Sequence, residues 1–194
     1  MQVGGQYGES RILEMFFRDV MSGTVVDVGA ADGYEHSNSY HLLQRHGWGG
    51  VLIEPDPFHY AELHKRYKDN PRVMTLNMGI AAEAGDGLLY CSGQASTFKP
   101  EWKKRAEEHQ GSVYTGETLV SLERLDVVLS QLGIVDVDFL SIDCEGMDHE
   151  VMSTLDFCVI QPRLICLETD GYPFPDGYFE FCKTRGNTFY VRDY

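Results

Sequence analysis

The sequence predicts an α/β fold, with a mostly parallel sheet and helices on both of its faces. Short apolar runs alternate along the chain with segments of helical periodicity, and glycine or proline separates most of them. The apolar runs lack polar alternation, which is typical of strands buried on both faces. The 194 residues suit one domain of ordinary size, so we expect residues 1–194 to form a single domain.

The first half of the chain predicts three strands and three helices. Apolar side chains recur at helical spacing from Glu9 to Met21, within an N-terminal helical segment that covers residues 1–22. A later helix begins at Asp56-Pro57, because Asp is a favourable N-cap and proline suits the first helical position. The expected strands are residues 24–28, 51–54 and 73–78, and the expected helices are residues 9–21, 37–46 and 57–70.

The second half is irregular at first and then resumes the alternation. Residues 82–117 are expected to form an irregular insertion or lid, which includes Ser96-Thr97 and a charged segment at 99–109 that predicts a solvated helix or a cover. An apolar stripe over residues 122–132 predicts a helix. The remaining expected strands are residues 88–91, 137–142, 163–168 and 188–191, and the remaining helices are residues 147–155 and 178–184.

Composition argues against several classes of function. The chain has 16 Lys and Arg against 30 Asp and Glu, a formal net charge of −14, so binding to nucleic acid or to an anionic membrane is disfavoured. The 5 cysteines show no CxxC spacing, which disfavours a disulfide framework or a zinc site. No apolar run approaches the roughly 18 residues of a membrane helix, and residues 1–20 lack the pattern of a signal peptide. We therefore expect a cytoplasmic protein.

Acidic side chains follow several of the expected strands. The carboxyl ends of parallel strands meet at one edge of a sheet, which is where open α/β sheets bind ligands. One acid at such an end has an alternative explanation as a helix N-cap, but repetition at the same structural place indicates a site. The acidic strand ends are Asp27–Gly33, Glu54–Pro57, Asp143–Gly146 and Glu168–Gly171.

The loop after the first strand selects among nucleotide-like ligands. Gly29 and Gly33 give a GxxxG spacing, without the middle glycine of the dinucleotide-binding pattern. Asp27 and Asp32 flank the loop, and an acid 4 Å from a phosphate charge costs about 4 kcal/mol at an effective dielectric constant of 20. The same acids favour a ligand with an ammonium and a sulfonium, such as S-adenosylmethionine. Glu54 suits the two hydroxyls of an adenosine ribose, which NAD and S-adenosylmethionine share.

These motifs also carry a family resemblance. With them the chain resembles the FkbM family of S-adenosylmethionine-dependent methyltransferases, although Ala31 stands where the family often has Asn. The resemblance implies a Rossmann-like class I methyltransferase sheet and, most often, O-methylation of a hydroxyl on a sugar or polyketide. It does not name the acceptor. The segments that match are Gln6–Glu9, Val25–Ser39, Gly47–Pro57, Val137–Val151 and Arg163–Gly171.

The resemblance also implies a set of cofactor-binding residues. The methionine end of the cofactor would lie against the loop after the first strand, and Glu54 would bind the ribose. Ser37 and Asn38 would bind the cofactor carboxylate or, equally, cap the next helix. Asn77 and Gly79, after the third strand, would lie near the adenine. The whole expected set is Asp27, Gly29, Asp32, Gly33, Ser37, Asn38, Glu54, Asn77, Gly79 and Asp143.

The acceptor side of the site is expected at the later strand ends. Asp143 and Glu145 are the first candidates to orient the acceptor hydroxyl or remove its proton, and Glu168 and Asp170 could share that task. Four converging carboxylates cannot all stay ionised without a cation or a proton. A divalent metal held through oxygen is therefore an alternative, but the resemblance does not require one and none is predicted.

Other residues near these motifs have structural explanations as well. His36 follows the glycine loop and is a candidate neighbour of the ligand, whereas His149 is expected on an exposed helix position. The aromatic residues after the last acidic strand end would wall the acceptor pocket or, by default, pack in the core. These are Tyr172, Phe174, Tyr178 and Phe179.

Two alternative functions remain at the level of sequence. One is a nucleotide- or sugar-nucleotide-dependent enzyme on a similar sheet, against which the missing middle glycine and the loop acids argue. The other is a non-catalytic cofactor-binding module, against which the acids at four strand ends argue. The predicted partner is a small hydroxylated acceptor, with no nucleic acid or membrane.

Overall fold

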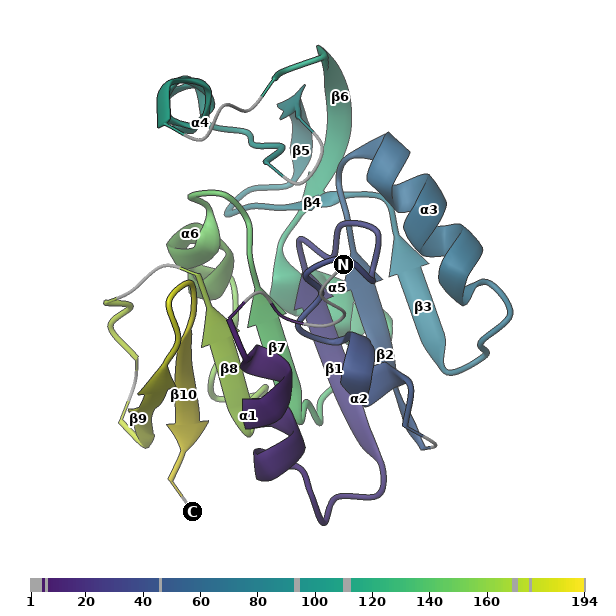
Figure 1. The fold of residues 1–194 in the computed structure, drawn as a ribbon, viewed down its shortest axis with the longest axis vertical. Helices are drawn as coiled ribbons and strands as arrows, with labels where there is room; N and C mark the ends of the chain where they lie inside the picture. The colour runs from purple at the N-terminus through teal and green to yellow at the C-terminus, as the bar shows by residue number, and fades with distance from the viewer. Residues whose placement is uncertain are drawn as a thin grey trace.

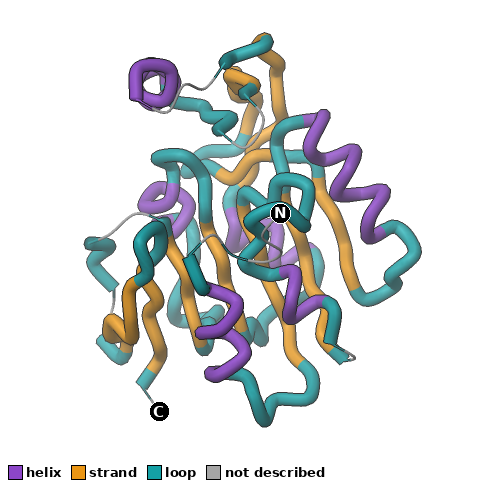
Figure 2. Tube along the Cα trace, in the orientation of Figure 1, coloured by secondary structure: helices purple, strands orange, loops and turns teal. Residues whose placement is uncertain are grey.

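The computed structural model describes residues 5, 7–45, 47–92, 95–109, 113–168, 171–174 and 176–193. Helices and strands alternate through most of the chain (Figures 1 and 2). In chain order the elements are α1 (Glu9–Phe16), β1 (Gly23–Val28), α2 (Tyr40–Leu43), β2 (Trp48–Ile53), α3 (Pro57–Tyr67), β3 (Val73–Leu76), β4 (Gly79–Ile80), β5 (Gly85–Cys91), α4 (Pro100–His109), β6 (Gly116–Glu123), α5 (Leu125–Gln131), β7 (Phe139–Ile142), α6 (Asp148–Ser153), β8 (Leu164–Leu167), β9 (Tyr178–Lys183) and β10 (Thr188–Arg192).

Seven strands form the main sheet, in the order β3-β2-β1-β7-β8-β10-β9. The five strands from β3 to β8 are parallel, and β10 runs antiparallel to both β8 and β9. The chain proceeds from β1 to β2 and β3 on one side and later returns to place β7 on the other side of β1. The strand order therefore reverses at β1, which is the place where open α/β sheets bind ligands.

Both faces of the main sheet are buried, as the apolar strand sequences predict. In β1, Val25 packs with one core cluster and Val26 with the other, because successive side chains of a strand point to opposite faces. The cluster that contains Val25 includes residues of α1, α2 and α3, and the cluster that contains Val26 includes residues of α5 and α6. Figure 1 shows α1 in front of the sheet and α5 behind it.

A second, three-stranded sheet stands over the carboxyl ends of the main strands. Its order is β4-β6-β5, and together with α4 it forms a cap, which we define as the described part of residues 79–123. Figures 1 and 2 show the cap above the end of the main sheet toward which the arrow of β3 points. The sheet ends described below therefore lie between the main sheet and the cap.

The strand at residues 178–183 corrects a sequence prediction. We expected a helix over 178–184, which is wrong: β9 pairs antiparallel with β10. From Phe179 onward the segment alternates, with Phe179 and Phe181 separated by Glu180 and followed by Cys182, a period of two that favours a strand. Similarly, Leu122 is not part of a helix but of β6, and α5 begins at Leu125.

Other elements exist as predicted but with different bounds. The N-terminal helix ends at Phe16, earlier than expected, and the expected helix over 37–46 is limited to Tyr40–Leu43 within the described residues. The charged segment at 99–109 is a helix, α4, as predicted. Residues 82–117, expected to be irregular, contain β5, α4 and the start of β6, so most of this insertion is regular structure.

Candidate functional site

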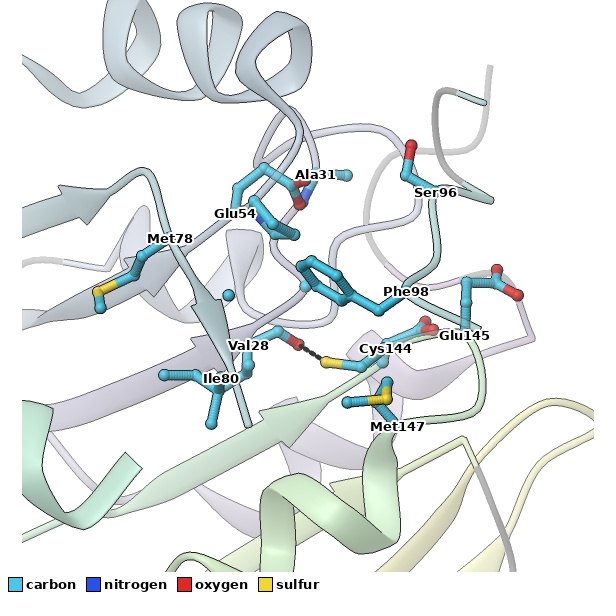
Figure 3. Close-up of a pocket in the computed structure, with 14 residues that line it drawn as sticks. Val28, Ala31, Glu54, Met78, Ile80, Ser96, Phe98, Cys144, Glu145 and Met147 are labelled. Atoms are coloured by element: carbon cyan, nitrogen blue, oxygen red, sulfur yellow. Dashed lines mark hydrogen bonds between the residues drawn. The ribbon is translucent and has the colours of Figure 1, made fainter. Parts of the chain in front are cut away.

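A groove at the switch point consists of two adjoining pockets that share Gly29, Ala31, Asp143 and Glu145. Their volumes, including space open to solvent, are about 530 and 820 Å³. The apolar pocket (Figure 3) is also lined by Val28, Glu54, Pro55, Met78, Gly79, Ile80, Ser96, Phe98, Cys144 and Met147. The acidic pocket is also lined by Asp27, Ala30, Glu35, His36, Ser37, Asn38, Ala95, Ser141 and Glu168.

Gly29 brings the loop after β1 into contact with the loop after β7. Its φ angle is 82°, and a Cβ at this position would lie 1.9 Å from the carbonyl oxygen of Asp143. No side chain fits there. The backbone N–H groups of Gly29 and Ala30 both donate to the carbonyl oxygen of Ile53, at 3.0 and 3.1 Å. The loop is therefore held between β2 and β7, with its backbone exposed to both pockets.

Glu54 organises the edge of the apolar pocket from the end of β2. Its carboxylate accepts hydrogen bonds from the backbone N–H of Ala31 at 2.8 Å and of Asp56 at 2.7 Å. Burial raises the pKa of Glu54 to about 7. A carboxylate offers about four lone-pair directions, so two remain for a ligand. Asn77 instead donates to the carbonyl oxygens of Glu54 and Pro55, and thus holds this loop without lining either pocket.

Asp32 and Gly33 lie outside the lining of both pockets. The Asp32 carboxylate accepts hydrogen bonds from the backbone N–H groups of Tyr34 and Glu35, and it pairs with Arg66 at 3.2 Å. Gly33 is close to α3, where a Cβ would lie 2.5 Å from the Leu63 side chain. The structure therefore separates these two predicted residues from Asp27 and Gly29, and Arg66 offsets the charge of Asp32.

The polar residues after the glycine loop lie in the acidic pocket. Ser39 donates a hydrogen bond to the buried Asp27 carboxylate at 2.5 Å, and burial raises the pKa of Asp27 to about 6. The Ser37 hydroxyl accepts from the backbone N–H of Tyr40, the first residue of α2, at 3.1 Å, although the N-cap position of this helix is Ser39. The Asn38 amide donates to the Ser141 hydroxyl at 3.5 Å, so Ser37 and Asn38 border the pocket while holding α2 to the sheet.

Asp143, Glu145 and Glu168 converge and form what we call the carboxyl trio. One carboxylate oxygen from each lies within 4.8 Å of the others. Burial, reinforced by the neighbouring carboxylates, raises the pKa of Glu145 and of Glu168 to about 7 and raises that of Asp143 well above its ordinary value. Glu168 Oε2 is buried without a hydrogen-bond partner. Asp170, the fourth predicted acid, lies outside the described residues.

The trio can hold either protons or a cation. Three oxygens at this separation are of the type that binds Mg²⁺ or Ca²⁺, and a shared proton relieves the same repulsion. The pKa values near 7 favour partial protonation at neutral pH. The arrangement can therefore orient a hydroxyl group and accept its proton.

The histidines and aromatic residues divide between site and core. His36 lines the acidic pocket, whereas His149 lines neither pocket and contacts the ring of Tyr172 with 5.4 Å between centroids. Tyr172, Phe174 and Tyr178 pack against the core, which is the default expectation for aromatic residues. Phe179 is 51% exposed and is absent from the lining of the groove.

Sequence reasoning missed the apolar wall of the first pocket. Figure 3 shows the Phe98 ring between Glu54 and Cys144, and Met78, Ile80 and Met147 also line this pocket. A Cβ at Gly79 would lie 2.7 Å from this ring, so the absence of a side chain at Gly79 makes room for Phe98. The wall is assembled from the cap and from the loops after β3 and β7, and no local pattern in the sequence links these segments.

In the described part of the chain, the Asp and Glu side chains that line the groove have no Lys or Arg among them. A ligand that carries a diphosphate would therefore meet no compensating Lys or Arg among these described residues, whereas a ligand with positive charge would be stabilised by the ionised carboxylates. The carboxylates of the lining are Asp27, Glu35, Glu54, Asp143, Glu145 and Glu168.

Comparison with protein families gives one match. The model of the methyltransferase FkbM domain matches residues 27–186, which include the strand-end loops of the groove. No curated protein sequence matches the chain. Among the described residues, none of the helices has the length and hydropathy that a membrane span requires.

Solved structures share the fold at low sequence identity. A candidate methyltransferase from Escherichia coli, yhhF, is 15% identical, with a TM-score of 0.57 over 99% of this chain and 89% of that one. A candidate methylase from Haemophilus influenzae is 11% identical, with a TM-score of 0.55 over 97% and 90%. The FkbM methyltransferase from Methylobacillus flagellatus is 16% identical, with a TM-score of 0.50 over 85% of this chain but 38% of that one. The α/β fold, with its mostly parallel sheet, matches class I methyltransferase structures.

Proposed function

The chain belongs to the FkbM methyltransferase family, and we propose that it binds S-adenosylmethionine in the groove and methylates a hydroxyl of a small molecule. The observation that carries this proposal is the negative lining, in which acidic side chains occur without any described Lys or Arg. Two like charges 4 Å apart cost about 4 kcal/mol at an effective dielectric constant of 20. The lining therefore disfavours NAD and sugar nucleotides, which carry a diphosphate.

The residues of the groove fit the parts of this cofactor. Gly29 allows close approach of a ligand to the loop backbone, and Glu54 keeps acceptor capacity for the ribose hydroxyls. The ring of Phe98, with Met78 and Ile80, offers an apolar surface for the adenine. Asp27 lies on the other side of the glycine loop, where positive charge at the methionine end would be stabilised. When bound, S-adenosylmethionine supplies a methyl group activated by a positively charged sulfur.

The carboxyl trio performs the acceptor chemistry in this proposal. A carboxylate oxygen of Glu145 or Asp143 accepts the proton of the attacking hydroxyl, while the remaining carboxyls orient that hydroxyl. With a pKa of about 7, Glu145 is a stronger base than an ordinary Glu and is still partly ionised at neutral pH. Alignment typically supplies about 7–11 kcal/mol, and a general base adds about 10²–10⁴-fold. A sugar or polyketide hydroxyl is the proposed acceptor class.

Calorimetry of the full chain with S-adenosylhomocysteine, NAD and UDP-glucose tests the proposal. We expect heat of binding from S-adenosylhomocysteine alone. In thermal unfolding, that ligand at 100 times its dissociation constant should stabilise the protein by about 2.7 kcal/mol. Tight binding of NAD or UDP-glucose, with no response to S-adenosylhomocysteine, would overturn the proposal.

Two variants locate the ligand within the groove. Glu54→Gln replaces an acceptor of two backbone N–H groups by an amide with a single acceptor oxygen, so we expect weaker binding of S-adenosylhomocysteine by about tenfold or more. Asp32→Asn is the matched control, because Asp32 pairs with Arg66 outside both pockets and Asn retains the acceptor for Tyr34. Wild-type affinity in Glu54→Gln would contradict this placement.

A further inference from the structure

Glu145 has a backbone conformation that its own residue type does not favour. Its φ angle is 45°, and Gly146 follows at 91°, so two successive residues lie in the left-handed region. Glycine adopts this region freely, whereas a glutamate there is uncommon and must be held by its surroundings. The contacts that hold the Glu145–Gly146 turn matter because the turn directs the Glu145 carboxyl toward Asp143 and Glu168.

The cap contacts this turn at two points. The Thr97 hydroxyl donates a hydrogen bond to the carbonyl oxygen of Glu145 at 3.0 Å. The indole of Trp102, on α4, lies against Gly146 so closely that a Cβ there would be 2.1 Å from Trp102 Nε1. Thr97 is 1% exposed, so water cannot readily replace its hydrogen bond. Both contacts involve the peptide unit between Glu145 and Gly146.

A third contact joins the cap to α6 and does not involve the Glu145–Gly146 turn. Lys99 forms an ion pair with Glu150 at 3.7 Å, with both side chains about one-third exposed. Partly exposed pairs of this kind contribute little to stability. This contact offers a control, because its loss weakens attachment of the cap without touching the turn at Glu145.

We propose that Thr97 and Trp102 are positioning residues that hold the Glu145 carboxyl in the trio, so that the cap helps to build the acceptor side of the groove. The proposal rests on the proposed function for its catalytic meaning, but its geometric content stands independently. If the turn is released, Glu145 leaves the trio and gains contact with water. The acceptor side then loses one of its three carboxyls.

The charge environment of Glu145 makes this release measurable. Burial, followed by Asp143 and Asp148, raises the pKa of Glu145 to about 7, whereas Arg105 on α4 acts in the opposite direction. Glu168 also faces it from the end of β8, and the pKa of Tyr114 is raised by burial and by Glu145. Leaving this cluster therefore lowers the pKa of Glu145 toward its ordinary value of 4.5.

NMR titration of the full chain, labelled with ¹³C at the glutamate carboxyls, measures the effect without any ligand. Glu145→Gln serves only to assign the resonance. In Thr97→Val the hydroxyl is lost at nearly constant volume, and we expect the pKa of Glu145 to fall from about 7 toward 4.5. Thr97→Ser keeps the hydroxyl and should restore the wild-type titration. Lys99→Met, the control, should also titrate like the wild type.

A second variant, Trp102→Leu, tests the same turn independently of Thr97→Val. The Thr97 hydroxyl also accepts a hydrogen bond from the backbone N–H of Lys99 at 3.1 Å, so Thr97→Val could disturb the start of α4. Trp102→Leu removes the indole from Gly146 by a different route, and the same fall in the pKa of Glu145 is expected. Circular dichroism confirms which variants are folded.

Two results would overturn the proposal. One is a wild-type titration of Glu145 in the folded Thr97→Val and Trp102→Leu variants. The other is an equal shift in Lys99→Met, which would mean that cap attachment in general, and not the contacts to the turn, sets the environment of Glu145. Calorimetry with S-adenosylhomocysteine on the wild type separately tests the proposed function, so failure of one does not imply failure of the other.

Discussion

Replacement of Gly29 by alanine is expected to damage the protein far more than the same replacement at Gly133. Both glycines have left-handed φ angles, 82° and 68°, so alanine is strained at each by about 1–2 kcal/mol. Their surroundings differ. A Cβ at Gly29 would lie 1.9 Å from the carbonyl oxygen of Asp143, whereas a Cβ at Gly133 would have no heavy atom within 4 Å.

The overlap at Gly29 involves backbone on both sides, so it is relieved only if the loop after β1 moves away from the loop after β7. Overpacking of this kind typically costs about 1–3 kcal/mol. We therefore expect Gly29→Ala to lower the free energy of unfolding by about 2–5 kcal/mol and Gly133→Ala by about 1–2 kcal/mol. Urea unfolding followed by circular dichroism measures both values.

The same pair of variants reports on the ligand. The two loops carry the residues that both pockets share, so calorimetry should show S-adenosylhomocysteine binding to Gly29→Ala about tenfold more weakly or worse, a difference of at least about 1.4 kcal/mol. Gly133→Ala should bind like the wild type. Equal destabilisation by the two variants would refute the steric argument, and unchanged affinity in Gly29→Ala would refute the placement of the ligand against this loop.

Three further predictions concern the trio and the apolar wall. Burial raises the pKa of Glu145 to about 7 from an ordinary 4.5, so Glu145 takes up a proton on folding and its contribution to stability falls as pH rises through 4.5 to 7. The variant Glu145→Gln should therefore raise the free energy of unfolding, measured in urea, by about 1–3 kcal/mol at pH 8 and by less at pH 5. An equal gain at both pH values would contradict this. Arg105→Gln should raise the pKa of Glu145 and Glu168 further in an NMR titration, because the charge of Arg105 lowers both. Phe98→Ala should weaken S-adenosylhomocysteine binding by about tenfold in calorimetry, whereas Phe179→Ala, at a 51% exposed position, should not change it.

The parallel part of the fold could be predicted because its signals are local. The runs around Val25, Val51 and Leu140 are apolar on both strand faces and end in glycine or acidic residues, so each identifies a strand without knowledge of its neighbours. The antiparallel edge of the main sheet was harder to predict from the sequence. Residues 178–183 contain enough apolar side chains to suit a helix, and only pairing with β10 shows that their period of two matters.

The site was predictable where one strand end sufficed, and not where distant segments had to meet. Glu54 and Asp143 line the groove, and the end of a parallel strand fixes the position of each. Asp32 stands in the same loop as Gly29, yet Arg66 of α3 pairs with it outside the pockets, and no sequence spacing announces that pair. Phe98 reaches the groove from the cap, so its role depends on the tertiary arrangement alone.

Ionisation of the acidic side chains that line the groove lowers conformational stability when no ligand is bound. Burial raises the pKa of Asp27 to about 6 and of Glu54 to about 7, which means that ionisation of these groups opposes folding at neutral pH. Conformational stability alone would favour apolar residues at such positions. A ligand with positive charge reverses the balance, because it favours the ionised carboxylates that the empty groove disfavours. In the proposed function, the same groups that weaken the fold thereby favour a cationic methyl donor over a diphosphate.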